Sequence, residues 1–406
     1  MPGKPTTILQ VIPRLDTGGA ELAVLELTEA LASVGARALV ASEGGRMADE
    51  IARLGGELIR LGVATKNPIT MWRNVARLER LIAGEGVDLV HARSRAPAWS
   101  ARAAARRAGV RFVTTYHGAY GEKGRFKRFY NAIMADGDLV IANSRYTAQL
   151  IEARYGTPPE RLRIIYRGVD LRAFDPVVVG AHRVDELRAR WNLGSGDRVI
   201  LNAARLTGWK GQRVLIDAAE ILYHQGALAN AVVVLAGDDQ GRGGYGDELR
   251  WQISAAGLDG RVLLAGHCAD MPAAFALADL AVVASIEPEA FGRAGAEAQA
   301  MGCPVIATDI GAPPETVRAT PAFAPYETTG WLVPPGNADA LANCIGSALE
   351  MDGPDRQAMA ERAQANVREN FSLRQMKRNT LAAYDELLGS DLAGRSQRAE
   401  TGRIAT

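Results

Sequence analysis

The amino-acid sequence predicts an α/β protein of two Rossmann-like domains, each a doubly wound parallel sheet. The chain has 406 residues, more than one hydrophobic core usually organises. Apolar runs typical of buried strands alternate with helical runs from residue 6 onward, which is the pattern of a parallel sheet with helices on both faces. A second series of the same kind begins at residue 198.

The first series fills residues 1–180. It opens with the strand TTILQVIP, and Gly18 and Gly19 then precede a helix that ends near Gly35. Two glycines at this place either bring backbone amides close to a ligand or form a plain tight turn. Further alternations follow, with predicted strands at residues 36–42, 56–61, 87–92, 111–118 and 138–144.

Two histidines, His91 and His117, lie at the carboxyl ends of predicted strands, where ligands of open α/β sheets bind. A single histidine is more often structural than functional, so the position alone decides little.

The second domain is assigned to residues 181–371, and residues 171–195 form the bridge that leads into its first strand at 198. Its first strand leads into the loop ARLTGWKG, where Arg205 and Lys210 could hold a diphosphate. The alternative is a pair of solvated surface charges. Further predicted strands lie at 231–237, 261–266, 277–285 and 305–308, and the last predicted helix covers 371–388. Residues 389–406 are polar and aperiodic, which predicts a disordered tail.

The most informative stretch is EPEAFGRAGAEAQAMGCPVIAT (287–308), which reads as an acidic loop, a helix and a strand. Gly292 and Gly295 would keep the first N–H groups of this helix open to an anion such as phosphate. Glu289 and Glu297 would then accept hydrogen bonds from hydroxyl groups on either side of it. A ligand with phosphate at its centre and hydroxyls at both ends is a nucleotide sugar. The alternative is an amphipathic helix with solvated glutamates.

This stretch strongly resembles the E-x7-E signature of the retaining glycosyltransferases of family 4, which have the GT-B architecture of two such domains facing across a cleft. The loops GGAE (18–21), TYHG (115–118) and ARLTGWKG (203–211) also match the pattern of that family. The resemblance covers nearly the whole chain, except for about the last 18 residues. It implies that the helix at 372–388 crosses back to the first domain.

The resemblance also implies roles for individual residues. Four would take part in catalysis: His117, Arg205, Lys210 and Glu289. The residues that would bind the donor are Gly18, Gly19, His267, Phe291, Gly292, Arg293, Ala294, Gly295 and Glu297. Of these, Arg293 replaces the apolar residue of many members. The resemblance further implies retention of anomeric configuration, closure of the two domains over the donor, and no cofactor.

Two literal motif matches are interpreted as coincidences. The G-x-G-x-x-G of residues 241–246 lacks the acid that a dinucleotide site has about 20 residues further on. Asp136-Gly-Asp138 resembles a D-x-D metal motif, but it precedes a strand instead of ending one. The sequence therefore predicts a turn there and no metal requirement.

Charge is distributed unevenly along the chain. Residues 1–180 carry a net charge of +8 and the remainder −7, and residues 93–128 hold ten Lys or Arg against one acid. This favours an anionic partner for the first domain. No nucleic-acid motif accompanies the cluster, so nucleic acid is disfavoured. The helix at 125–135 is either a membrane-surface helix or an amphipathic helix packed on the sheet.

The sequence thus predicts transfer of a sugar from a UDP- or GDP-sugar to an anionic saccharide or lipid-linked acceptor, as in cell-envelope or lipopolysaccharide biosynthesis. The alternatives are another GT-B enzyme such as an epimerase, or an inactive nucleotide-sugar-binding homologue. No apolar run has the length of a membrane span and no signal-peptide core opens the chain. Cys268, Cys303 and Cys344 lack metal or redox spacing. We therefore expect a cytoplasmic protein, with peripheral contact to the inner membrane face through 93–128.

Overall fold

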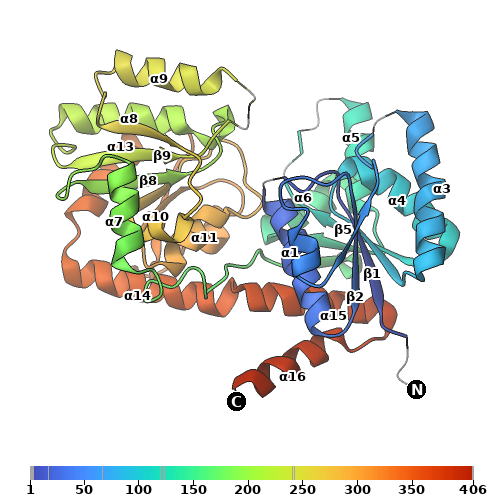
Figure 1. Ribbon diagram of the computed structural model, residues 1–406. Helices are drawn as coiled ribbons and strands as arrows, with labels where there is room; N and C mark the ends of the chain where they lie inside the picture. Colours follow the sequence, from blue (N-terminus) through green and yellow to red (C-terminus); the bar gives the residue numbers. More distant parts are fainter. Residues whose placement is uncertain are drawn as a thin grey trace. The chain divides into compact units, whose positions relative to one another are not determined.

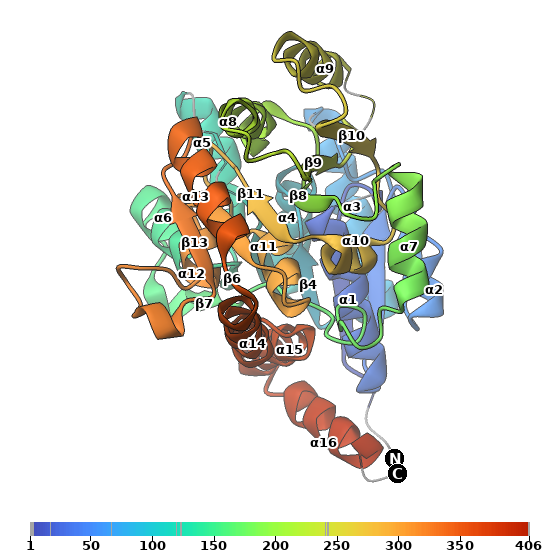
Figure 2. The same cartoon turned by 90° about the vertical axis from the view of Figure 1, so that its left-hand side faces the viewer.

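The computed structural model describes residues 4–16, 18–65, 67–118, 120–121, 124–239, 241 and 243–404. The chain forms two compact units, of which unit 1 is the part up to Tyr166 with the part from Leu373 on, and unit 2 is Arg167–Ser372 (Figures 1 and 2). The chain passes from unit 1 to unit 2 after Tyr166, earlier than the predicted domain boundary at residue 180. The reason is that the backbone of Val169 already pairs with the end of unit 2, donating to the carbonyl of Phe371 at 2.8 Å.

Unit 1 contains a parallel sheet of seven strands in the order β3-β2-β1-β4-β5-β6-β7. The strands are β1 Thr7–Val11, β2 Arg37–Ser42, β3 Glu57–Arg60, β4 Leu89–Ala92, β5 Arg111–Tyr116, β6 Leu139–Ala142 and β7 Leu162–Ile164. Side chains alternate between the two faces of each strand. Ile8 joins the apolar cluster that includes α1 and α15, whereas Leu9 joins the cluster with α3 and α4. Both faces are therefore buried by helices, as Figure 1 shows for this unit.

The helices of unit 1 are α1 Gly19–Ser33, α2 Glu50–Arg53, α3 Pro68–Glu85, α4 Arg95–Ala108, α5 Arg125–Ala132, α6 Arg145–Tyr155, α15 Leu373–Leu388 and α16 Leu392–Ile404. Helix α15 returns from unit 2 and buries Tyr384 against the sheet. The final helix of the sequence prediction therefore belongs to unit 1.

Unit 2 contains a parallel sheet of six strands in the order β10-β9-β8-β11-β12-β13. The strands are β8 Arg198–Ala203, β9 Ala231–Ala236, β10 Val262–Gly266, β11 Leu280–Val283, β12 Val305–Thr308 and β13 Gly330–Val333. Along β8, Ile200 packs with α8 and α13, while Val199 packs on the opposite face with α7 and α10. The predicted fold of two doubly wound parallel sheets is confirmed.

The helices of unit 2 are α7 Ala181–Arg190, α8 Gln212–His224, α9 Tyr245–Ala255, α10 Met271–Leu277, α11 Arg293–Ala300, α12 Pro313–Thr316, α13 Ala338–Glu350 and α14 Gly353–Asn370. The long helix α14 was not predicted from the sequence. Within the described residues, no helix of either unit is both long and apolar enough to cross a membrane.

The C-terminal segment differs from the prediction, because residues expected to form a disordered tail contain helix α16. The carboxylate of Asp385 accepts hydrogen bonds from the backbone N–H groups of Leu392, at 2.7 Å, and Ala393, at 2.8 Å. Leu392 is fully buried with Tyr384 in the core of unit 1. One capping carboxylate and one apolar anchor thus order a segment whose composition suggests disorder.

Candidate functional site in unit 2

A buried ion pair lies at the carboxyl edge of the unit 2 sheet. Strands β8 and β11 are neighbours, and the loops that follow them meet beyond the sheet. Lys210 ends a short 3₁₀ helix after β8, and its Nζ lies 2.8 Å from Oε1 of Glu289 in the loop after β11. The two side chains are only 16% and 9% exposed. Two residues predicted to act on a donor are therefore in direct contact.

Glu289 is fixed by loops from three neighbouring strands. The hydroxyl of Ser285, at the end of β11, donates to the same Oε1 that contacts Lys210. The backbone carbonyl of Glu289 accepts from the N–H of Ala312, after β12, at 2.9 Å. In the described part of the chain, no hydrogen bond reaches Oε2. This second oxygen can accept a hydrogen bond from a ligand hydroxyl.

The turn that carries Lys210 depends on Gly211. This glycine has φ of +73°, and a Cβ added to it would lie 1.8 Å from the carbonyl oxygen of Ala284. Only a residue without a side chain lets the start of α8 approach β11 so closely. The carbonyl of Trp209 also accepts from the N–H of Ile286 at 2.8 Å. The backbones of the two loops are thereby linked beside the ion pair.

The start of α11 agrees with the sequence prediction only in part. Gly292 caps the helix with φ of +82°, a conformation that favours glycine. Gly295 does not keep an N–H open, because its N–H donates to the carbonyl of Gly292 at 3.1 Å. A Cβ on Gly295 would meet Val283 and Val305 at 3.7 and 3.8 Å. Gly295 therefore lies against the sheet, and the prediction for it is corrected.

Four further predicted donor residues lie on or beside α11. Glu297 is one turn into the helix, and its Oε1 lies 3.2 Å from Nε of Arg293. Because Glu289 precedes the helix, helical spacing does not place these two glutamates on one face. Ala294 is half-buried in the first turn. Phe291 packs edge-on against Phe371 and is 4% exposed, so its side chain belongs to the core.

The remaining predicted residues of unit 2 lie at the same edge of the sheet. Arg205 follows β8 and is exposed, and its carbonyl accepts from Nε2 of Gln212 at 2.9 Å. His267 follows β10 and is also exposed. Its loop is held by Asp270, which caps α10 and accepts two hydrogen bonds from Arg183, at 2.9 and 2.6 Å. The contact with Arg183 lowers the pKa of Asp270.

The three cysteines lie in unit 2 as free thiols. Burial raises the pKa of each, to about 12 for Cys344. A thiol whose pKa is raised is a poor nucleophile at neutral pH.

Unit 1 contains the other predicted residues at the carboxyl edge of its own sheet. Gly18 is the N-cap of α1, which Gly19 begins, and His117 directly follows β5 and is half-buried. His91 is fully buried, with Nδ1 2.5 Å from the Tyr384 hydroxyl and Nε2 2.7 Å from Oγ1 of Thr115. The structure therefore gives His91 a structural role, joining α15 to the sheet.

The basic segment 93–128 does not form one surface. Arg93 is buried and donates to Oε1 of Gln10 at 2.8 Å. Burial lowers its pKa. The described exposed cations separate into a group on α5, with Arg125, Lys127 and Arg128, and a group at the other edge of the sheet, with Arg106, Arg107 and Arg111.

The structure also describes residues of the two literal motif matches, the D-x-D at 136–138 and the G-x-G-x-x-G at 241–246. Asp138 accepts a hydrogen bond from the N–H of Phe112 at 2.8 Å, and Asp136 pairs with Arg102 and Arg161. These contacts fix the turn before β6. Over the described ranges, no three His, Cys, Asp or Glu side chains lie together as metal ligands would. In the glycine motif, Gly246 already lies in α9, and position 242 lies outside the described residues.

Comparison with known proteins agrees with this architecture. The profile of Glycosyltransferase Family 4 matches residues 17–173, and that of Glycosyl transferases group 1 matches residues 183–366. A glycosyltransferase structure from Rickettsia africae ESF-5 is 32% identical with a TM-score of 0.86, covering 95% of this chain and 99% of that one. Anabaena HepE in complex with UDP-glucose is 25% identical with a TM-score of 0.80, covering 94% of this chain and 100% of that one.

Among curated proteins, the D-inositol 3-phosphate glycosyltransferase of Salinispora tropica is 33% identical over 260 residues. The match covers 63% of this chain and 52% of that protein. The chain therefore spans about half the length of the curated relatives it matches.

Proposed function

The chain belongs to glycosyltransferase family 4, and from that premise we propose that it transfers a sugar from a UDP-sugar to an anionic saccharide or lipid-linked acceptor. The observation that carries the proposal is the buried pair of Lys210 and Glu289, 2.8 Å apart at the carboxyl edge of the unit 2 sheet. An ammonium suits a diphosphate and a carboxylate suits sugar hydroxyls. A nucleotide sugar presents both groups side by side.

Donor binding would give each member of the pair a new partner. Lys210 and the exposed Arg205 would contact the diphosphate, and the start of α11 would add backbone N–H groups. Glu289 would orient the transferred sugar through Oε2, while Glu297 would accept from the ribose and the backbone around His267 would hold the base. The complex of the relative HepE with UDP-glucose supports uracil as the base.

The reaction breaks the bond between the anomeric carbon and the diphosphate oxygen, and the electron pair leaves with the diphosphate. We propose that Lys210 and Arg205 stabilise this negative charge without a metal ion. Preorganised charges of this kind are usually the largest catalytic term. The acceptor hydroxyl would enter on the face that the diphosphate leaves, which retains the configuration, and the leaving phosphate would take its proton.

We propose that unit 1 serves the acceptor, through the cationic and aromatic surface of α5. Phe126 is 93% and Phe129 67% exposed, beside Arg125, Lys127 and Arg128. Such a surface suits a phosphorylated or lipid-linked saccharide at the inner face of the cytoplasmic membrane. The Salinispora relative is a D-inositol 3-phosphate glycosyltransferase, which supports an acceptor that carries phosphate.

The donor assignment is tested by thermal unfolding of the full chain with UDP, GDP, ADP and their sugar conjugates, in EDTA. A ligand at 100 times its Kd adds about 2.7 kcal/mol to the free energy of unfolding. We expect this shift with UDP compounds, and its loss in Arg205→Ala and Glu297→Ala. A shift only with NAD, or none with any nucleotide, contradicts the proposal. Interconversion of UDP-sugars without acceptor would identify an epimerase instead.

A further inference from the structure

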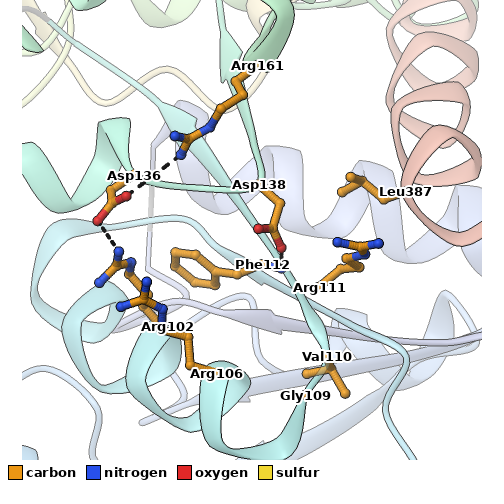
Figure 3. Close-up of a pocket in the computed structure, with 10 residues that line it drawn as sticks. All are labelled: Arg102, Arg106, Gly109, Val110, Arg111, Phe112, Asp136, Asp138, Arg161 and Leu387. Atoms are coloured by element: carbon orange, nitrogen blue, oxygen red, sulfur yellow. Dashed lines mark hydrogen bonds and ion pairs between the residues drawn. The ribbon is translucent and has the colours of Figure 1, made fainter. Parts of the chain in front are cut away.

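A pocket of about 800 Å³ lies in unit 1, beside the turn before β6 that contains Asp136 and Asp138 (Figure 3). It is lined by the second half of α4, the first residues of β5, the turn before β6, Arg161 before β7 and Leu387 of α15. These parts surround the amino ends of parallel strands. Gly18, Gly19 and His117 follow the carboxyl ends of strands in the same sheet. The pocket is therefore at the opposite edge from the predicted ligand residues of unit 1.

Four arginines and two aspartates give the pocket a net positive charge: Arg102, Arg106, Arg111, Arg161, Asp136 and Asp138. Both carboxylates already have partners within the protein. Asp136 pairs with Arg102 and, at 3.7 Å, with Arg161, while Asp138 accepts from the N–H of Phe112 at 2.8 Å. These contacts are drawn as dashed lines in Figure 3.

Arg106 and Arg111 are the uncompensated charges of the pocket. Both are exposed, and neither has an acidic partner among the residues that the structure describes. Their neighbour Arg107 differs, because it lies outside the pocket and its guanidinium is 3.5 Å from the carboxylate of Glu79. The pocket therefore presents two guanidinium groups, each with free N–H donors in the planar arrangement that matches phosphate oxygens.

We propose that this pocket binds a phosphate group of a small phosphorylated compound, at a site separate from the donor site. A phosphate ester carries about −1.5 to −2 charges at pH 7, which balances the two guanidinium groups. A ligand with a single carboxylate would leave one guanidinium group uncompensated. The volume lies within the range of small-molecule sites, about 300–1,000 Å³, and exceeds what phosphate alone needs. Asp136 holds Arg102 and Arg161 in place as the wall of the site.

The test is calorimetric titration of the full chain with pyrophosphate. Because the donor site would also bind diphosphate, the titration is made in an Arg205→Ala/Lys210→Ala background. We expect one remaining binding event, weakened at least about tenfold by Arg106→Gln/Arg111→Gln, which corresponds to about 1.4 kcal/mol. The control is Arg107→Gln, which removes the exposed arginine next to Arg106 on α4 but outside the pocket, and it should leave the affinity unchanged.

The proposal is overturned if pyrophosphate does not bind in this background, or if Arg106→Gln/Arg111→Gln binds it as Arg107→Gln does. Both altered side chains are exposed, so an unchanged Tm is expected and separates lost binding from unfolding. A parallel binding measurement with phosphatidic acid vesicles distinguishes a lipid phosphate from the phosphate of a small soluble compound. Vesicle binding that depends on Arg106 and Arg111, without binding of pyrophosphate, would overturn the assignment to a small soluble compound.

Discussion

At the scale of single residues, the candidate donor site depends on a charged pair that is almost excluded from water. Lys210 and Glu289 satisfy each other at 2.8 Å, and removing one of them leaves a buried charge without its partner. A bound diphosphate would compensate Lys210 and release Glu289 toward a sugar hydroxyl. The pair is thus a resting arrangement of groups that the proposed reaction would use separately.

Replacing Lys210 by alanine is expected to lower kcat with UDP-sugar by about 10²–10³-fold, the usual effect of removing one preorganised electrostatic contact. The measurement is kcat at saturating donor, with Tm recorded to detect lost stability. The control is Arg213→Ala, which removes a cation at the start of α8 that is 54% exposed and pairs with Glu248. If kcat falls equally in both variants, Lys210 has no special role in transfer.

Much of this site could be predicted from residue types and spacing, but not the contacts between its members. Lys210 and Glu289 were predicted individually, since each lies in a loop that follows an apolar strand. Their direct contact depends on β8 and β11 being neighbours, and strand order is not visible in one sequence. Ser285, which donates to Glu289, was missed for another reason, since a serine after a strand has many ordinary roles. Phe291 and Gly295 were assigned to the ligand although they pack inward.

At the scale of elements, the position of Lys210 depends on the turn that precedes α8. Gly211 joins the 3₁₀ helix of Lys210 to α8 and lies against the last residues of the β11 segment. Its requirement for glycine is twofold, since φ is positive and no space exists for a Cβ. The position of Lys210 is therefore set by a backbone contact one residue away.

Gly211→Ala is expected to unfold more easily than Gly226→Ala, and also to weaken UDP binding. Both glycines have positive φ, +73° and +75°, but a Cβ on Gly226 meets nothing within 4 Å. Gly226→Ala therefore isolates the conformational strain, about 1–2 kcal/mol, and the further loss in Gly211→Ala measures the steric contact. The measurements are urea unfolding and UDP titration. Equal destabilisation with equal UDP affinity would contradict the role given to this contact.

The prediction of helices and strands succeeded where the apolar pattern is strong, and it failed where a single side-chain contact orders the segment. Strand β9, for example, was predicted at residues 231–237 and is observed at Ala231–Ala236. Helix α14 was missed although the sequence contains signals for its start. Asp352 caps the helix, and a proline follows in its first turn. Helix α16 could not be predicted from its composition, since it is ordered by the distant carboxylate of Asp385 and by burial of Leu392.

At the scale of the whole molecule, charge is segregated along the chain. Residues 1–180 carry +8 and the remainder −7, an asymmetry that predicts an anionic partner for the first domain. The structure separates the exposed basic residues into the α5 surface and the pocket at the amino ends of the strands. These two places require different tests, because they lie on different elements and differ in apolar content.

The α5 surface makes a prediction about membranes that the pocket does not share. Phe126 and Phe129 are exposed beside Arg125, Lys127 and Arg128, and each basic residue near an anionic bilayer contributes about 1 kcal/mol. Reversing the three charges is therefore expected to weaken binding to anionic vesicles at least 100-fold, since about 3 kcal/mol is lost. Phe126→Ser should weaken it further by removing apolar insertion.

Vesicle co-sedimentation at two salt concentrations measures this effect. The attraction should fall as salt rises, because the Debye length is only about 8 Å at physiological ionic strength. The aromatic control is Trp251→Ser, a side chain 74% exposed on α9 of unit 2, and the charge control is Arg107→Glu on α4. If reversing Arg125, Lys127 and Arg128 changes neither vesicle binding nor acceptor turnover, α5 is an ordinary surface helix, and the acceptor must be recognised elsewhere.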